Sequence, residues 1–132
     1  EGVYIDEALN VVYPAQIGEN SPVEVFMAHT DVVFSDETEL PLRVENGRIW
    51  CPGVGDDTAC LVCLLLAGKY IAEHIGTPQW KELRGEHAPG LVLVCNSGEE
   101  GLGNLKGVRI SAPLTAAWSI WWTGRWALSV SG

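Results

Sequence analysis

The sequence predicts an α/β domain in which a mostly parallel central sheet is flanked by helices. Two short apolar segments, residues 23–28 (VEVFMA) and 91–95 (LVLVC), are rich in β-branched residues, as strands buried in a parallel sheet are. Between them, the stretch from Thr58 to about Ile75 consists of good helix formers with apolar residues on nearly every side. The alternation of strand, helix and strand is typical of α/β domains, and the apolar helix is expected to press against the sheet.

Composition and charge limit the classes of function. The chain has 132 residues, 47% of them hydrophobic, which suits one folded domain with a sizeable core. Its formal net charge of −9 would repel a phosphate backbone, so we expect no nucleic-acid partner. The longest apolar run, residues 59–68, is far shorter than the roughly 20 residues of a membrane-spanning helix, so no membrane partner is expected.

The cysteines indicate a reducing compartment. Cys51, Cys60, Cys63 and Cys95 lie in apolar or strand-like segments and lack the dense spacing of a secreted disulfide scaffold. The first residues also lack the pattern of a signal peptide. We therefore expect reduced thiols in a cytoplasmic protein, with Cys60 and Cys63 packing inside the helix rather than forming a redox or zinc pair.

A β-hairpin is predicted at about residues 42–50. Its centre is Asn46-Gly47, a pair that readily adopts the positive φ angles of a tight two-residue turn. Further along the chain, Asp56 or Asp57 is expected to cap the start of the long helix.

The composition of the segment between the long helix and the second strand predicts a loop. Residues 76–90 contain two prolines and three glycines without a sustained period. A second short helix is expected from near Gly101 to about Arg109.

Three clusters of polar residues carry the candidate chemistry. His29 and Asp31 follow the first predicted strand, Asp56 opens the helix, and Glu99 and Glu100 follow the second strand. Ligands in open α/β sheets gather beyond the carboxyl ends of the strands, so these clusters are expected to converge on one cleft. A histidine with several carboxylates suits zinc or a similar divalent ion, and a nearby carboxylate suits deprotonation of a metal-bound water. Carboxylates also favour helix N-termini, so each acidic pair alone has an ordinary structural explanation.

The three clusters together resemble the co-catalytic zinc exopeptidases and amidohydrolases, a family that includes aminoacylase, peptidase T, carboxypeptidase G and acetylornithine deacetylase. The matching segments are AHTDVVF at 28–34, GVGDDTA at 53–59 and NSGEEGLGNLKG at 96–107, in the family's order and at family-like spacing. The resemblance implies a zinc-exopeptidase-like fold that is incomplete, with residues 1–109 forming part of the catalytic domain.

The resemblance also implies a role for each site residue. His29 is expected to bind one zinc ion, and Asp31 to hold the histidine ring by a hydrogen bond. Asp56 is expected to bridge two zinc ions, and Glu100 to ligate the second. Glu99 is expected to be the catalytic general base that takes a proton from the bridging water.

Two neighbouring positions are not assigned to the metal. Asp57 occupies a variable position of the family, and Thr58 stands where many members have a lysine that is not a ligand.

The implied activity is hydrolysis of a peptide bond, or of the amide bond of an N-acyl amino acid, by zinc-activated water. The substrate would be a small peptide or an N-acyl amino acid, and cobalt or manganese are alternatives to zinc. The family's further acidic ligand and final histidine have no counterpart, because no Asp, Glu or His follows Glu100. Impaired or absent activity is therefore expected for this chain. The alternative is a non-catalytic, weakly metal-binding α/β module or a self-associating fragment.

Residues 110–132 form a Trp-rich tail that does not resemble the family. Trp118, Trp121, Trp122 and Trp126 fall at helical spacing on one face, within a segment that contains no acid. Such a face suits core packing, a partner surface or membrane contact, and we favour packing or homo-oligomer formation. One hypothesis for the origin of the tail is a reading-frame change close to Arg109.

Overall fold

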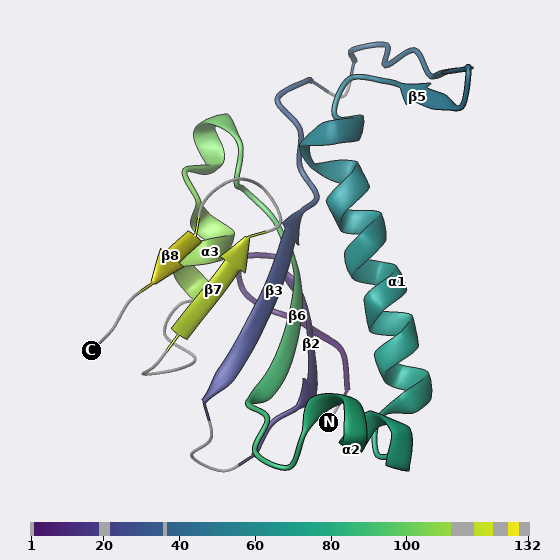
Figure 1. The fold of residues 1–132 in the computed structure, drawn as a ribbon. Helices are drawn as coiled ribbons and strands as arrows, with labels where there is room; N and C mark the ends of the chain where they lie inside the picture. Colours follow the sequence, from purple (N-terminus) through teal and green to yellow (C-terminus); the bar gives the residue numbers. More distant parts are fainter. Residues whose placement is uncertain (1, 19–21, 36, 112–117, 123–126, 130–132) are drawn as a thin grey trace.

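A computed structural model describes residues 2–18, 22–35, 37–111, 118–122 and 127–129, and for residues 110, 111, 118–122 and 127–129 it describes the backbone alone. Strands make up the first part of the described chain, and helices and further strands follow (Figure 1). The elements are β1 (Tyr4–Ile5), β2 (Val11–Gln16), β3 (Val23–His29), β4 (Arg43–Glu45), β5 (Arg48–Trp50), a π-helical turn (Val54–Thr58), α1 (Ala59–His74), α2 (Pro78–Arg84), β6 (Gly90–Asn96), a 3-10 turn (Gly101–Gly103), α3 (Lys106–Ser111), β7 (Trp118–Trp122) and β8 (Ala127–Ser129).

The main sheet is mixed, whereas the sequence predicted a mostly parallel one. In the described part of the chain, six strands follow the order β1-β2-β6-β3-β7-β8. Strand β3 is parallel to both of its neighbours, β6 and β7, but the pairs β1–β2, β2–β6 and β7–β8 are antiparallel. No strand was expected at residues 4–16, and the short connection between β1 and β2 permits only an antiparallel pair.

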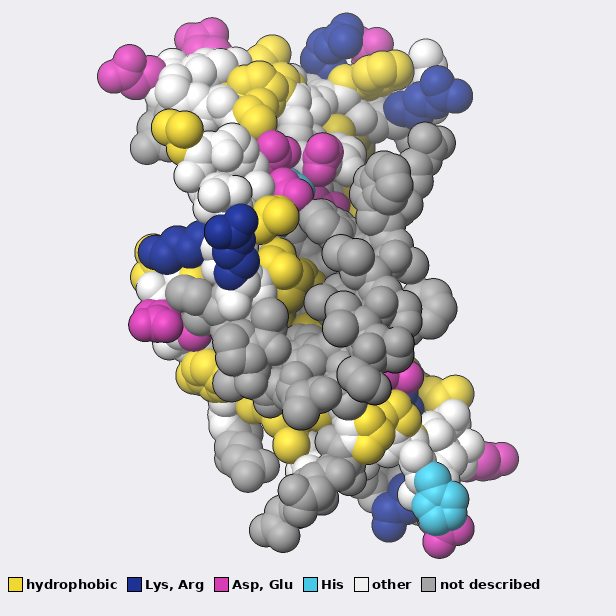
Figure 2. Space-filling view, turned by 90° about the vertical axis from the view of Figure 1, so that its left-hand side faces the viewer, with side chains coloured by type: hydrophobic (Ala, Val, Ile, Leu, Met, Phe, Trp, Pro, Cys, Tyr) yellow, Lys and Arg dark blue, Asp and Glu magenta, His cyan; other side chains and the backbone are white. Residues whose placement is uncertain are grey.

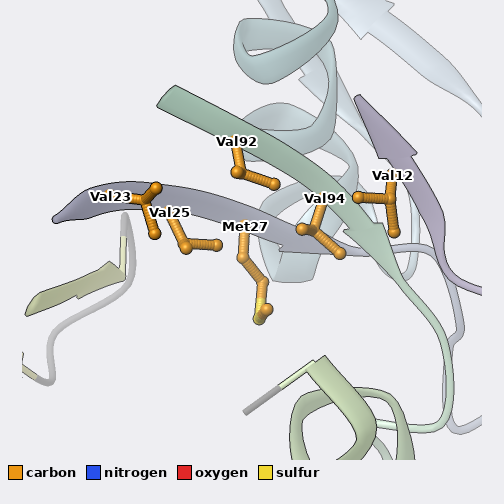
Figure 3. Packing of buried hydrophobic residues seen from close by; sticks show 6 residues of the cluster. All are labelled: Val12, Val23, Val25, Met27, Val92 and Val94. Carbon is orange, nitrogen blue, oxygen red and sulfur yellow. The ribbon is translucent and has the colours of Figure 1, made fainter. Parts of the chain in front are cut away.

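Apolar side chains fill both faces of the sheet. On one face, Val23, Val25 and Met27 of β3 pack beside Val92 and Val94 of β6 and Val12 of β2, and Val108 of α3 covers this cluster (Figure 3). On the other face, Leu91 and Leu93 of β6 pack against Leu64 and Ile71 of α1 and Trp80 of α2. Because successive strand residues point to opposite faces, a continuous apolar run is what a doubly covered strand requires.

Helix α1 covers one face of the sheet but does not bury its whole circumference. Leu64 and Ile71 are buried against the strands, whereas Val62, Leu65 and Leu66 are exposed. The expectation of a helix pressed against the sheet is therefore met along one stripe of α1.

The predicted aspartate cap of α1 is wrong. The residue at the N-cap is Thr58, and its side chain accepts no capping hydrogen bond. Asp56 and Asp57 lie in the preceding π-helical turn, where their carboxylates bond to His29 instead.

The segment predicted as a loop at residues 76–90 contains the helix α2. The hydroxyl of Thr77 accepts a hydrogen bond from the backbone N–H of Trp80, and Pro78 occupies the first helical turn. Trp80 is buried, and its indole N–H donates to Gln16 Oε1 at 3.0 Å. One cap and one buried aromatic anchor stabilise a helix too short for a periodic pattern.

The region expected as one helix at residues 101–109 is divided. The 3-10 turn and α3 are separated by Asn104 and Leu105, both of which have positive φ angles. This left-handed break prevents the first turn from continuing into α3.

The described residues of the tail that carry Trp118, Trp121 and Trp122 form a strand rather than the helix that the Trp spacing suggested. Backbone pairing places Trp118–Trp122 beside β3, and β8 pairs with this segment. Tryptophan is favoured in strands, and β3 has an edge to which a strand can add. Trp126 lies outside the described residues.

Strands β4 and β5 form a separate two-stranded antiparallel sheet. The turn between them uses φ angles of +52° at Asn46 and +72° at Gly47. This hairpin projects beyond the start of α1, away from the main sheet (Figure 1). None of the four cysteines, all in the described part of the chain, forms a disulfide. Among the described helices, none is long and apolar enough to cross a bilayer.

The packing on both faces of the sheet predicts that alanine substitutions at two valines change the free energy of unfolding by very different amounts. We expect Val94→Ala to lower the free energy of unfolding by about 2 kcal/mol, because Val94 is 2% exposed and its loss leaves a cavity beside β3. Val44→Ala in the projecting hairpin, where the side chain is 68% exposed, should change it by less than about 0.5 kcal/mol. Urea unfolding followed by circular dichroism measures both, and equal values would contradict this account of the core.

Candidate metal centre

The candidate site lies where β3 and β6 end. These strands are parallel neighbours, and the last residue of β3, His29, is in register with the last residue of β6, Asn96. The carboxyl ends of the two strands therefore meet at one edge of the sheet, where α/β folds place their ligands. The loops that leave this edge supply the carboxylates.

The ring of His29 is buried and bonded at both nitrogens. Nδ1 lies 2.9 Å from the backbone carbonyl oxygen of Asp31, and Nε2 lies 3.0 Å from Oδ1 of Asp56. A carbonyl oxygen only accepts hydrogen bonds, so Nδ1 carries a proton, and the carboxylate at Nε2 favours a second one. In this arrangement the ring is best satisfied as an imidazolium.

The electrostatic surroundings of His29 agree with that protonation state. Burial by itself lowers the pKa of the ring, because the charged form loses hydration. The hydrogen bonds to Asp56 and to the carbonyl of Asp31, with the negative charges of Asp57 and Glu99, outweigh burial and raise the pKa above 6.5. The site therefore holds a positive charge among its carboxylates.

Glu99 and Glu100 bring two further carboxylates to the same place. One ligand atom from each of His29, Glu99 and Glu100 lies within 4.8 Å of the others. Burial raises the pKa of Glu99, nearby His29 opposes that shift, and the charges of Glu100, Asp56 and Asp31 add to it, so the pKa is above 4.5. A carboxyl group with a raised pKa is suited to proton transfer near neutral pH.

Asp31 contacts the ring of His29 through its backbone and the glutamate pair through its side chain. Its backbone carbonyl, rather than its carboxylate, bonds to the ring of His29, since Asp31 Oδ1 is 3.8 Å from Nδ1. The carboxylate instead accepts the backbone N–H groups of Glu99 at 3.2 Å and Glu100 at 2.9 Å. Asp31 thus links the loop after β3 to the glutamate pair after β6.

Asp57 belongs to the site, although the sequence placed it at a variable position. It is 5% exposed, and its Oδ2 accepts the backbone N–H of His29 at 3.1 Å. The adjacent Asp56 has a side chain that is 82% exposed and reaches His29 from the solvent side, and the peptide bond between the two aspartates is cis. The signal for both residues was the acidic doublet itself, but the sequence could not show which member faces the interior.

The donor set fits a divalent ion such as zinc. Imidazole nitrogen and carboxylate oxygen are both zinc ligands, and the Nδ1–H bond to a carbonyl is the contact that orients metal-ligating histidines. Figure 2 shows acidic side chains gathered around a small exposed part of a histidine on the upper part of the face in view. The structure brings all five residues predicted from sequence together. Direct contacts join His29 to Asp56 and Glu99, and Glu99 to Asp31. Glu100 joins them because its ligand atom lies within 4.8 Å of those of His29 and Glu99.

Comparison with known proteins gives one family. Residues 25–117 match Peptidase family M20/M25/M40, and all five predicted site residues lie within this segment. No curated protein matches the sequence. The match covers well over half of the chain and runs beyond residue 109, where the resemblance noted from the motifs ended. The chain therefore belongs to peptidase family M20/M25/M40, a family of metal-dependent hydrolases that typically bind zinc.

Proposed function

We propose that this chain acts in the zinc-dependent hydrolysis of a peptide bond or of the amide bond of an N-acyl amino acid. The observation that carries the proposal is the cluster of His29, Glu99 and Glu100, with ligand atoms within 4.8 Å of one another at the edge where two parallel strands end. Family membership supports metal-dependent hydrolysis, and the mixture of imidazole and carboxylates favours zinc, with cobalt or manganese as alternatives.

In this proposal, different residues of the site bind the metal ion and transfer the proton. A bound divalent ion lowers the pKa of a water molecule and polarises the carbonyl group under attack. Nε2 of His29 must release its proton to act as a ligand, while the carbonyl of Asp31 retains the proton on Nδ1. Glu100 and Asp56 supply negatively charged oxygens for the metal.

Glu99 is the general base of this proposal. It lies within the cluster, with Oε2 4.0 Å from Nε2 of His29, and its raised pKa suits a group that takes a proton from the attacking water and then passes it to the leaving amine. Its side chain is 19% exposed, so water is partly excluded from it.

The proposal also includes a substrate class and a cellular location. A net charge of −9 disfavours nucleic acid as a partner. The small peptide or N-acyl amino acid substrate that we propose is the one that the family resemblance implies. Four cysteines without a disulfide support a cytoplasmic location.

One observation favours the alternative of a non-catalytic module that binds metal weakly. Nε2 of His29 already has a partner, because Oδ1 of Asp56 lies 3.0 Å away. The buried histidine is therefore satisfied by the protein itself, and a metal ion must compete with that contact. Self-association through the Trp-rich tail at residues 110–132 belongs to this alternative.

Zinc titration of the chelator-stripped protein separates the two functions. We expect His29→Ala and Glu100→Ala each to weaken zinc binding at least tenfold, because each removes a ligand from the cluster. Glu73→Ala is the matched control, since Glu73 is an exposed residue of α1 that pairs with Lys69. Calorimetry measures the affinities. Equal affinity in all four proteins would place any bound zinc elsewhere and exclude the proposed site.

Hydrolysis tests Glu99 directly. We expect zinc-loaded protein to release amino acid from dipeptides or N-acetyl amino acids, and Glu99→Gln to lower kcat by about 100-fold or more, because the amide cannot accept the proton. Product is measured by an amine-reactive dye. Tight zinc binding without release of product by the unmodified chain would favour the non-catalytic alternative.

Zinc affinity should depend on pH with a sign that His29 determines. Because the pKa of His29 is raised, zinc must displace a proton from the ring at any pH below that pKa. The affinity should therefore fall as pH is lowered through that pKa, approaching tenfold per pH unit for one displaced proton, and level off at higher pH.

Titrations between about pH 6 and pH 8 measure this dependence. His74→Gln, which alters a histidine at the end of α1, should leave the profile unchanged. A profile in the unmodified chain that is flat over this range would show that zinc does not use His29.

A further inference from the structure

A buried asparagine outside the metal site is bonded to both ends of the segment that carries the glutamate pair. Asn10 lies just before β2 and is 0% exposed. Its Oδ1 accepts the backbone N–H of Ser97 at 2.9 Å, and its Nδ2 donates to the carbonyl oxygen of Gly107 at 2.9 Å. Residues 97–107 form the segment in which Glu99 and Glu100 lie.

The turn before β2 fixes Asn10 in place. Nδ2 also donates to Oδ2 of Asp6 at 2.8 Å, while Oδ1 of Asp6 accepts the backbone N–H groups of Ala8 and Asn10. The hydroxyl of Ser97 donates to the carbonyl oxygen of Ala8. The amide of Asn10 is thus held by charge-assisted and backbone hydrogen bonds within a rigid turn.

Asn10 bridges the place where the two ends of the segment meet. The backbone N–H of Gly107 donates to the carbonyl oxygen of Ser97 at 3.1 Å, and that of Lys106 to Gly98 at 3.2 Å. A Cβ atom at Gly107 would collide with the carbonyl oxygen of Ser97 and with Oδ1 of Asn10, so only glycine permits this approach. The loop is therefore closed at its base, two residues before Glu99.

We propose that Asn10 is a positioning residue of the metal centre. It fixes Ser97 and Gly107 from one side, while the carboxylate of Asp31 holds the backbone N–H groups of Glu99 and Glu100 from the other. Ligands on a loop bind metal well only when such outer contacts restrict them. The effect on metal binding rests on the proposed function, whereas the effect on the backbone of residues 97–107 does not.

Amide hydrogen exchange of the chelator-stripped full chain tests the backbone effect. We expect Asn10→Ala to speed exchange in residues 97–107 at least tenfold, measured by mass spectrometry of peptides. Thr77→Ala is the matched control, because it removes the side-chain cap of α2, which lies at the opposite end of the molecule from the carboxyl end of β3 (Figure 1). If both variants speed exchange in this segment equally, Asn10 acts only through global stability and the proposal is overturned.

Zinc calorimetry of the same variants tests the effect on the metal. Asn10→Ala should weaken zinc binding at least tenfold, and Thr77→Ala should leave it within twofold. If Asn10→Ala fails to fold, Asn10→Asp is used, which keeps the shape but turns the donor that faces Asp6 and Gly107 into an acceptor. Its added negative charge alone would tighten zinc binding, so weaker binding reports a displaced loop.

The two measurements separate the failure of each idea. An unmodified chain that binds no zinc would reject the proposed function, and hydrogen exchange would still decide whether Asn10 fixes residues 97–107. If the unmodified chain binds zinc and the affinity of Asn10→Ala or Asn10→Asp is within twofold of it, the positioning role is overturned. The proposed function is then unaffected.

Discussion

The parallel pairing of β3 with β6 is the constraint on which the candidate site depends. Because His29 and Asn96 are in register at the ends of these strands, the loops that follow them leave the sheet side by side. Both strands can occupy the middle of the sheet because apolar side chains cover each face, from α3 on one side and from α1 and α2 on the other. The core therefore brings the histidine and the glutamate pair to the same edge of the sheet.

The sequence predicted the parts of this arrangement that have a local signature. The apolar runs of β3 and β6, the helix-forming stretch of α1 and the acidic doublets are visible without tertiary information. The helix α2 was missed because a seven-residue helix is stabilised by a threonine cap and one buried tryptophan rather than by periodicity. The antiparallel strands β1 and β2 were missed because β1 forms by pairing with β2, and β2 by pairing with the distant β6, which no local pattern encodes.

The roles of individual carboxylates were less predictable than their presence. Asp56 and Asp57 are adjacent and chemically identical, yet one is mostly exposed and meets the ring of His29, whereas the other is buried and meets its backbone. For Asp31, the spacing of two residues from His29 fits a bond to the ring through either the carbonyl or the carboxylate. In the structure the carbonyl oxygen of Asp31 bonds to the ring of His29, because the Asp31 carboxylate accepts the backbone N–H groups of Glu99 and Glu100. These choices depend on contacts between residues about 30 to 70 positions apart, which spacing along the chain does not specify.

The acidic cluster needs a compensating positive charge when no metal ion is bound, and the protonated ring of His29 supplies it. Several carboxylates in a partly buried site repel one another, and that repulsion contributes to the raised pKa of Glu99. An imidazolium bonded to Asp56 supplies the compensating positive charge in the protein alone. In the site that we propose, a divalent ion would take the place of the Nε2 proton, so the carboxylates would be compensated in both states. The imidazolium therefore compensates the cluster in the protein alone, and a metal ion at the proposed site would have to compete with the Nε2 proton.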